Sequence, residues 1–183
     1  MKLNRILCIL MCALLWPAVA MGADRESIPS HGVTVQVDFA DPSRFLDVNP
    51  EGMDAAKGQE VVLNKVRDVF RTEAQKRLPY GYSMIVQVKD IDLAGDYEPW
   101  RDPEDQARID REIYPPRIEF EYEIIDDSGN VLSTGSEYLN NLFYLLDPAG
   151  AKHRNSEVAY DVSMLIREWM KGPLYRKISE HAS

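Results

Sequence analysis

Cysteine is almost absent from this chain, and the sequence predicts that none remains after export. The two cysteines, Cys8 and Cys12, lie in the apolar run Ile6 to Trp16, which follows a short basic segment and precedes the small residues of "PAVAMGA". This order is typical of a secretory signal peptide. We therefore expect residues 1–23 to be removed and residues 24–183 to reach the periplasm as one domain. The loss of both thiols would exclude disulfides, thiolate catalysis and cysteine metal sites.

Long hydrophobic segments are also missing. The apolar run at residues 6–16 is shorter than the roughly 20 residues that a membrane-spanning helix needs. No later stretch of the chain reaches that length. We therefore expect no membrane span.

Basic residues are in the minority. The chain has 21 lysine and arginine residues against 30 aspartate and glutamate residues, and removal of Lys2 and Arg5 with the signal peptide leaves 19 against 30, a net charge of −11. Phosphate backbones and anionic lipid surfaces repel such a protein. The composition argues against nucleic acid as a partner.

Side chains for covalent or metal catalysis are few. The only imidazoles are His31, His153 and His181, and each lies in a segment that we expect to be solvated. The sequence has no G-x-S-x-G elbow, no glycine-rich phosphate loop and no H-E-x-x-H helix. We predict no catalytic residue of these classes, no cofactor and no metal site.

The periodicity of apolar residues predicts elements in the order β-α-β-β-β-α. Strands are expected at "VTVQVDF", "SMIVQVKDIDL", "RIEFEYEII" and "VLSTGSEYL", with a turn at "DDSGN" between the last two. The first helix should end at Leu78, before Pro79. The last should run from an N-cap at Ser156 to a stop at Gly172 and Pro173. The expected fold is α+β, a two-layer sandwich with a mixed sheet of about four strands and two main helices on one face.

The second predicted strand changes its apolar parity near its end. Continuing the face that holds Val88 would bury Asp90 and Asp92, whereas apolar residues resume at Ile91, on the other parity. Burying an unpaired carboxylate is costly. We therefore predict a bulge or a strand break near residues 89–90 that turns both carboxylates outward.

One arginine on the third strand has the parity to pair with these carboxylates. If the second and third strands are antiparallel neighbours, Arg117 lies beside Asp90 and Asp92 and can form a charge-assisted pair. A structural ion pair and a ligand-binding role both stay open. The candidate functional cluster is Asp90, Asp92, Asp96, Glu98 and Arg117.

The same stretch imitates a calcium loop. "DIDLAGDYEPWR" has carboxylates at several positions of an EF-hand, but Ala94 and Arg101 occupy two of the ligand positions. A strand also precedes it where the motif requires a helix. We expect no tight calcium site.

The connection from Ala94 to Pro116 is long for a compact domain. "DPEDQARIDREI" favours a short helix that begins after Asp102 and places Ile109 and Ile113 against the body. Extended structure over "ARIDREI" is the alternative.

An apolar run after the fourth strand is the candidate partner patch. Leu142, Phe143, Tyr144 and Leu145 show no clean periodicity. Exposed residues of this kind mark interfaces. The favoured interpretation is that the run packs as a loop over the core, so that a charged residue at Leu142 or Phe143 would unfold the protein.

Four segments of the chain resemble, in order, the signature blocks of a bacterial family, the domain of unknown function 3016. They are "VDFADPSRFLD", "LPYGYSMIVQVKDIDLAG", "YPPRIEFEY" and "AYDVSMLIREW". The most specific part is "DIDLAG" together with "PPRI". The resemblance implies a secreted periplasmic domain and supplies no activity, cofactor or site residue.

Two functional hypotheses follow. The first is a non-enzymatic periplasmic domain, monomeric in isolation, that binds an envelope protein or a cell-wall component. The second is a hydrolase that uses the carboxylates of the candidate cluster on an envelope component. A hydrolase predicts a concave pocket in which carboxylates converge with raised pKa values, whereas a flat acidic surface favours binding.

Overall fold

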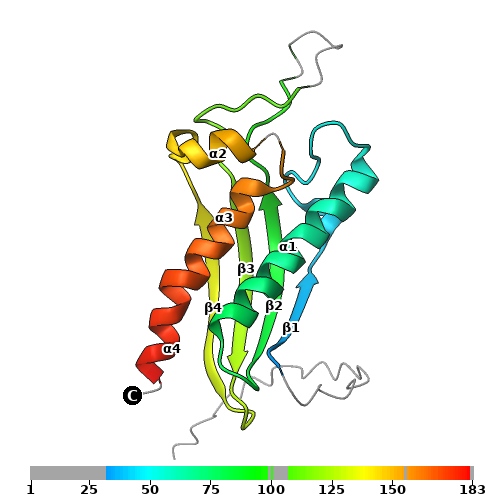
Figure 1. Cartoon of the computed structure of the whole chain (residues 1–183). Helices are drawn as coiled ribbons and strands as arrows, with labels where there is room; N and C mark the ends of the chain where they lie inside the picture. Colours follow the sequence, from blue (N-terminus) through cyan, green and yellow to red (C-terminus); the bar gives the residue numbers. More distant parts are fainter. Residues whose placement is uncertain (1–31, 99, 101–106, 155, 182–183) are drawn as a thin grey trace, which may run out of the picture.

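The computed structural model describes residues 32–98, 100, 107–154 and 156–181. It has one four-stranded sheet in the order β1-β2-β3-β4, with α1 and α3 side by side across one face (Figure 1). The strands are β1 (Thr34–Phe39), β2 (Ser83–Asp92), β3 (Arg117–Ile125) and β4 (Val131–Asn140). β1 and β2 are parallel, and the other neighbouring pairs are antiparallel. The predicted α+β fold and order of elements are confirmed, whereas the predicted signal peptide lies outside the described residues.

The first helix follows the sequence signals closely. The helices are α1 (Ala55–Arg77), α2 (Pro148–His153), α3 (Tyr160–Trp169) and α4 (Tyr175–His181), with short turns η1 (Pro42–Arg44), η2 (Tyr144–Leu146) and η3 (Met170–Leu174). Asp54 caps α1, since its side chain accepts the backbone N–H of Lys57 at 3.1 Å. The helix ends at Leu78, as predicted, because the residue before a proline avoids helical geometry.

The helices and the inner face of the sheet enclose one hydrophobic core. Phe120 of β3 is fully buried, with its ring centroid 5.2 Å from that of Phe70 on α1 and 4.8 Å from that of Trp169 on α3. Both ring pairs meet edge to face, which is a favourable geometry for aromatic rings. Phe120 therefore joins both main helices to the centre of the sheet.

The predicted bulge in β2 is confirmed. Val88 pairs with Phe120 and Asp90 pairs with Glu119, so Lys89 has no partner residue on β3 and the register shifts there. After the shift, Ile91 is fully buried and both aspartates face outward. The bulge lets the apolar face continue without burying either carboxylate.

The last helix differs from the prediction at both ends. It begins at Tyr160 rather than after Ser156, because Ala159 adopts a left-handed conformation with φ +53°. Gly172 and Pro173 do not stop it, since the chain passes through the π-helical turn η3 and continues as α4. A π turn is one way in which a helix accommodates a proline. The turn also buries Met170 and Leu174 against the core, which favours continuing the helix.

The described part of the long connection contains no helix and combines an extended segment around Ile109 with turns. Ile109 forms an isolated antiparallel bridge with Asp96, which supports the extended alternative over the helix. Ile113 is 70% exposed, so its predicted contact with the body is wrong. The segment from 101 to 106, which includes the predicted cap at Asp102, lies outside the described residues. No helix in the described part of the chain is long and apolar enough to cross a membrane.

Candidate functional site

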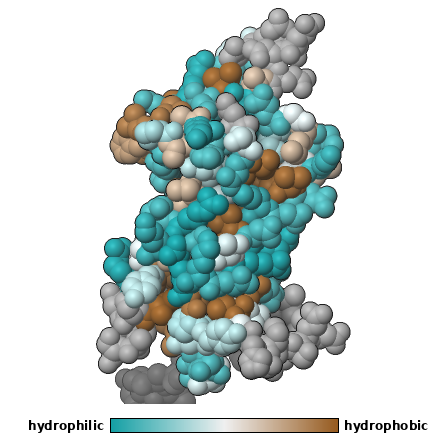
Figure 2. All heavy atoms as spheres, viewed as in Figure 1, coloured by the Kyte–Doolittle hydropathy of each residue, from teal (hydrophilic) through white to brown (hydrophobic). Residues whose placement is uncertain are grey.

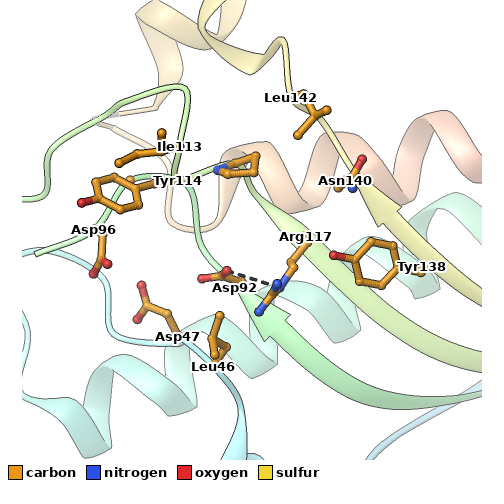
Figure 3. Close-up of a pocket in the computed structure, with 12 residues that line it drawn as sticks. Leu46, Asp47, Asp92, Asp96, Ile113, Tyr114, Arg117, Tyr138, Asn140 and Leu142 are labelled. Atoms are coloured by element: carbon orange, nitrogen blue, oxygen red, sulfur yellow. Dashed lines mark ion pairs between the residues drawn. The ribbon is translucent and has the colours of Figure 1, made fainter.

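A pocket of about 440 Å³ lies at the end of the sheet where β2 ends, β3 begins and β4 ends. Asp92, Arg117 and Tyr138 reach it from the three strands, on the face opposite the buried core because side chains alternate along a strand. Figure 3 shows these groups below the segments that carry Tyr114 and Leu142. The lining consists of Leu46, Asp47, Asp92, Gly95, Asp96, Ile113, Tyr114, Pro115, Arg117, Tyr138, Asn140 and Leu142.

Asp92 and Arg117 form the floor of the pocket. Arg117 Nε lies 3.3 Å from Asp92 Oδ2, the ion pair drawn as a dashed line in Figure 3. Burial raises the pKa of Asp92 to about 6, with the attraction of Arg117 opposing the shift and repulsion from Asp47 and Asp90 adding to it. Arg117 Nε is buried without a partner in hydrogen-bond geometry, so this ion pair leaves one donor of the guanidinium unsatisfied.

Asp90 has a structural role as well as an electrostatic one. Its carboxylate accepts the backbone N–H of Leu46 at 2.7 Å and lies 3.8 Å from Arg117. Asp47, in the same loop, accepts the N–H of Asn49 at 2.9 Å. The backbone N–H of Asp47 donates to Ile91 at 3.0 Å. These contacts fix the loop that forms one wall of the pocket against the end of β2.

Arg108 holds this wall to the long connection. Its guanidinium donates to the backbone oxygens of Asn49, Leu93, Ala94 and Gly95, at 2.5 to 3.3 Å. It also pairs with Asp47 at 2.6 Å and is 9% exposed. Such a forked donor set is particular to arginine. Asp47 Oδ2 is therefore held in an ion pair with Arg108, although this buried oxygen accepts no hydrogen bond in good geometry.

The opposite wall is held by a second arginine. Arg154 donates to Asp161 at 2.8 Å and to the backbone oxygen of Tyr144 at 2.8 Å. The Tyr144 hydroxyl in turn donates to the backbone oxygen of Arg111 at 2.9 Å. Burial raises the pKa of Tyr144 to about 12, so this donor stays protonated. The segment that carries Ile113 and the one that carries Leu142 are thereby joined through buried hydrogen bonds.

The structure brings together most of the predicted cluster. Asp90, Asp92 and Arg117 meet as predicted, and Asp96 lines the same pocket. Glu98 does not join them, because its buried carboxylate pairs with Arg111 at 3.0 Å.

Among the other lining residues, Leu142 belongs to the predicted partner patch, and sequence reasoning assigned no site role to the rest. Tyr138 could have been found from strand register, because it pairs with Glu119 across β3 and β4 and so shares its outward parity. Asp47 and Tyr114 lie in irregular segments, where no periodicity marks them.

The predicted packing of the apolar run is wrong for its first two residues. Leu142 is 57% exposed and Phe143 is 71% exposed, whereas Tyr144 is fully buried. Tyr144 therefore does not belong to a partner patch, and Leu145 is only half-buried. The exposed residues lie beside η2 and α2. Figure 2 shows hydrophobic atoms at this end of the molecule and also near the opposite end.

The pocket has the composition of a binding site with an acidic lining. Three carboxylates and one guanidinium line it, together with two phenol rings and several apolar side chains. In the described ranges of the chain, no group of three or more His, Cys, Asp or Glu side chains could hold a metal ion. The concave shape and the raised pKa of Asp92 meet part of the expectation for a hydrolase. That expectation requires several carboxylates with raised pKa values in the pocket, and Asp92 supplies one.

Residues 33–172 match the family described as "Protein of unknown function (DUF3016)". The chain belongs to this family. No curated protein matches the chain. Among solved structures it is similar to a single-substitution variant of the PelC dodecamer from Paraburkholderia phytofirmans, with 12% identity, a TM-score of 0.34, and coverage of 78% of this chain and 84% of the other. A second PelC dodecamer structure from the same organism gives 13% identity, a TM-score of 0.31, and coverage of 74% and 81%.

Proposed function

We propose that this member of the family is a non-enzymatic periplasmic domain that binds a component of the cell envelope in the pocket at the end of β2. The observation that carries the proposal is the pocket itself. Its volume of about 440 Å³ lies within the range of small-ligand sites. Its polar groups converge from three neighbouring strands, which hold them rigidly.

The chemistry of the lining favours binding over turnover. Asp47 forms an ion pair with Arg108, and Asp90 accepts the backbone N–H of Leu46, so both carboxylates already make contacts that hold the pocket wall. Asp96 is exposed and accepts the N–H of Tyr97 at 2.7 Å. General acid and base catalysis by a carboxylate pair requires two groups with different pKa values facing one substrate. Asp92 supplies one such group.

The second candidate function is a hydrolase in which Asp92 is the general acid. One observation favours it: the pKa of Asp92, raised to about 6, keeps a fraction of the carboxyl protonated near neutral pH. Asp96 would then be the second carboxylate. This candidate differs from binding in a single measurable respect, the formation of product.

A ligand screen tests both functions. Residues 24–183 would be screened by thermal shift against cell-wall fragments, oligosaccharides and short peptides, since a ligand of the native state raises the melting temperature. Asn140→Trp should abolish the shift by filling the pocket, and Gln36→Trp, on the opposite edge strand β1, should retain it.

Mass spectrometry of the same mixtures separates the two candidates. Unchanged ligand supports binding. Product that disappears with Asp92→Asn supports the hydrolase instead. A ligand that shifts the melting temperature of Asn140→Trp as much as that of the original chain would overturn the assignment of the pocket.

A further inference from the structure

Among the residues that the structure describes, no strand pairs with the outer edge of β4, which is long for an edge strand. β4 has ten residues and lies at the end of the sheet, with β3 as its neighbour (Figure 1). In the described part of the chain, residues 131–140 make no backbone hydrogen bond to any element other than β3. Alternate N–H and C=O groups of the strand therefore face away from the sheet, ready to pair with another chain.

β4 carries only part of the usual protection of an edge, because its register shift lies near its start, at Leu132, and its contact with α4 is on the helix side of the sheet. Natural edges carry prolines or outward charges that prevent pairing. β4 has no proline, and its single charged residue is Glu137. The carboxylate of Glu137 lies 2.6 Å from Lys177 of α4, on the helix side of the sheet. An incoming strand would meet no charge on the outward side of β4.

The pocket lies at one end of this edge. Tyr138 and Asn140 belong to β4, Leu142 follows it, and all three line the pocket. A strand added to β4 would run past the pocket mouth, and alternate side chains would point to the outer face, where Tyr138 lies. One of them could enter the pocket.

The charges around the pocket indicate what that side chain would be. Asp92 and Asp96 face the pocket, and Arg117 is shared between Asp92 and Asp90. The acidic character continues along the outer face of β3, where Glu119 is exposed. A cationic group complements this surface, whereas an anionic group would be repelled.

The apolar and aromatic lining fits a long basic side chain in particular. The rings of Tyr114 and Tyr138 can lie against a cation. Ile113 and Leu142, which are 70% and 57% exposed, can cover the aliphatic stem of lysine or arginine. These groups would be poorly placed for a short polar ligand.

We propose that the ligand is an extended peptide segment of an envelope protein that pairs with the outer edge of β4 and inserts a lysine or arginine side chain into the pocket. The inference rests on the proposed binding function and names the class of ligand. A second copy of the chain is a poorer occupant, because β4 itself, "VLSTGSEYLN", contains no lysine or arginine to offer to the pocket. A glycan lacks the regularly spaced N–H and C=O groups that match a strand edge.

The test uses defined peptides with residues 24–183. The probe is an acetylated and amidated decapeptide that alternates threonine and valine, with one central threonine replaced by lysine. Three comparison peptides are used with it. The first has glutamate in place of lysine. The other two are N-methylated at alternate amides, one at the odd-numbered and one at the even-numbered positions of the peptide. Binding is measured by calorimetry, and the site is located by amide chemical shifts of residues 131–140.

We expect the lysine peptide to bind at least about tenfold more tightly than the glutamate peptide, as a desolvated charge contact would require. One N-methylated peptide should lose binding and the other should keep it, because one parity of amides faces β4. Asp92→Asn should weaken the lysine peptide by about five- to tenfold, and Asp127→Asn, in the turn between β3 and β4, should not.

Three results would overturn the inference. They are equal affinity for the lysine and glutamate peptides, unchanged affinity for both methylated peptides, and binding by none of the set. In each case a sugar or cell-wall fragment that still binds and is blocked by Asn140→Trp would leave the proposed function standing. Sedimentation should show a monomer in the absence of peptide, and a dimer that shields the amides of β4 would replace the peptide with a second copy.

Discussion

The two faces of the sheet are held together by different forces. On the inner face, Phe120 and its neighbours are buried against α1 and α3, and the contacts are apolar. Around the pocket on the outer face, Arg108 and Arg154 hold irregular segments through backbone oxygens and carboxylates. The first region resists unfolding because it removes apolar surface from water. The second positions charged groups that an apolar core could not hold.

This difference explains how a small domain tolerates arginines with little solvent exposure around the site. Buried arginines are expensive unless their donors are satisfied. Arg108 meets that requirement with four backbone oxygens and one carboxylate. Arg117 does not, since its Nε has no hydrogen-bond partner in good geometry. Arg108, whose donors have partners, supports the pocket wall, and Arg117, which has one donor without a partner, lines the pocket.

The largest expected effect is in the apolar region. Phe120→Ala should lower the free energy of unfolding by about 3–5 kcal/mol, because it removes the ring that contacts both α1 and α3. Urea denaturation followed by circular dichroism would measure the change. Ile85→Ala, on the outer face of neighbouring β2, is the control and should lose less than about 1 kcal/mol. Equal losses from the two variants would contradict the core assignment.

A smaller and local effect is expected around the pocket. Arg108→Ala should lower the free energy of unfolding by about 2–4 kcal/mol, because it leaves Asp47 and several backbone oxygens unpaired. Hydrogen exchange should accelerate at residues 93–98, whereas amides of Phe120 and its strand neighbours keep their ranking as the slowest. Arg71→Ala, on the exposed face of α1, should change neither. Uniform acceleration would indicate that Arg108 supports the whole fold.

The raised pKa of Asp92 should make the free energy of unfolding depend on pH. Its pKa in the folded protein is raised to about 6 from 3.8, so the folded state binds a proton more tightly and its stability falls as pH rises through that window. Asp92→Asn should therefore stabilise the protein by about 1–2 kcal/mol at pH 7 and have a much smaller effect at pH 4. Denaturation at both pH values would measure this.

Asp68→Asn, on the exposed side of α1, is the matched control for Asp92→Asn. It should leave the difference in stability between pH 4 and pH 7 unchanged. A destabilising effect of Asp92→Asn at pH 7 would show that the Arg117 ion pair outweighs burial.

The smallest effect is expected at the exposed apolar residues. Leu142→Asp and Phe143→Asp should each change the free energy of unfolding by less than about 0.5 kcal/mol, as is usual for exposed sites. This outcome is the opposite of the one that the sequence predicts, in which a charge at either position unfolds the protein. Thermal melting of both variants would decide between the two, with Tyr144→Asp as the buried control that should unfold.

Regular periodicity made the sheet and the bulge predictable. Because alternate residues of a strand face one side, the change of parity at Ile91 required a shift of register, and Asp90 and Asp92 had to point outward. The same rule placed Arg117 beside them. Signals of a single residue type were less dependable. Gly172 and Pro173 indicate a helix stop, but the burial of Met170 and Leu174 continues the helix through them.

The sequence by itself determined the order of the elements, the inner face of the sheet and the family, because each depends on neighbouring residues along the chain. Only the tertiary structure decided the pocket, because its walls join segments that are far apart in sequence. Arg108 reaches Asn49, and Arg154 is linked through Tyr144 to Arg111. Contacts at such separations leave no local period, since their energy is gained only after the strands have brought the loops together.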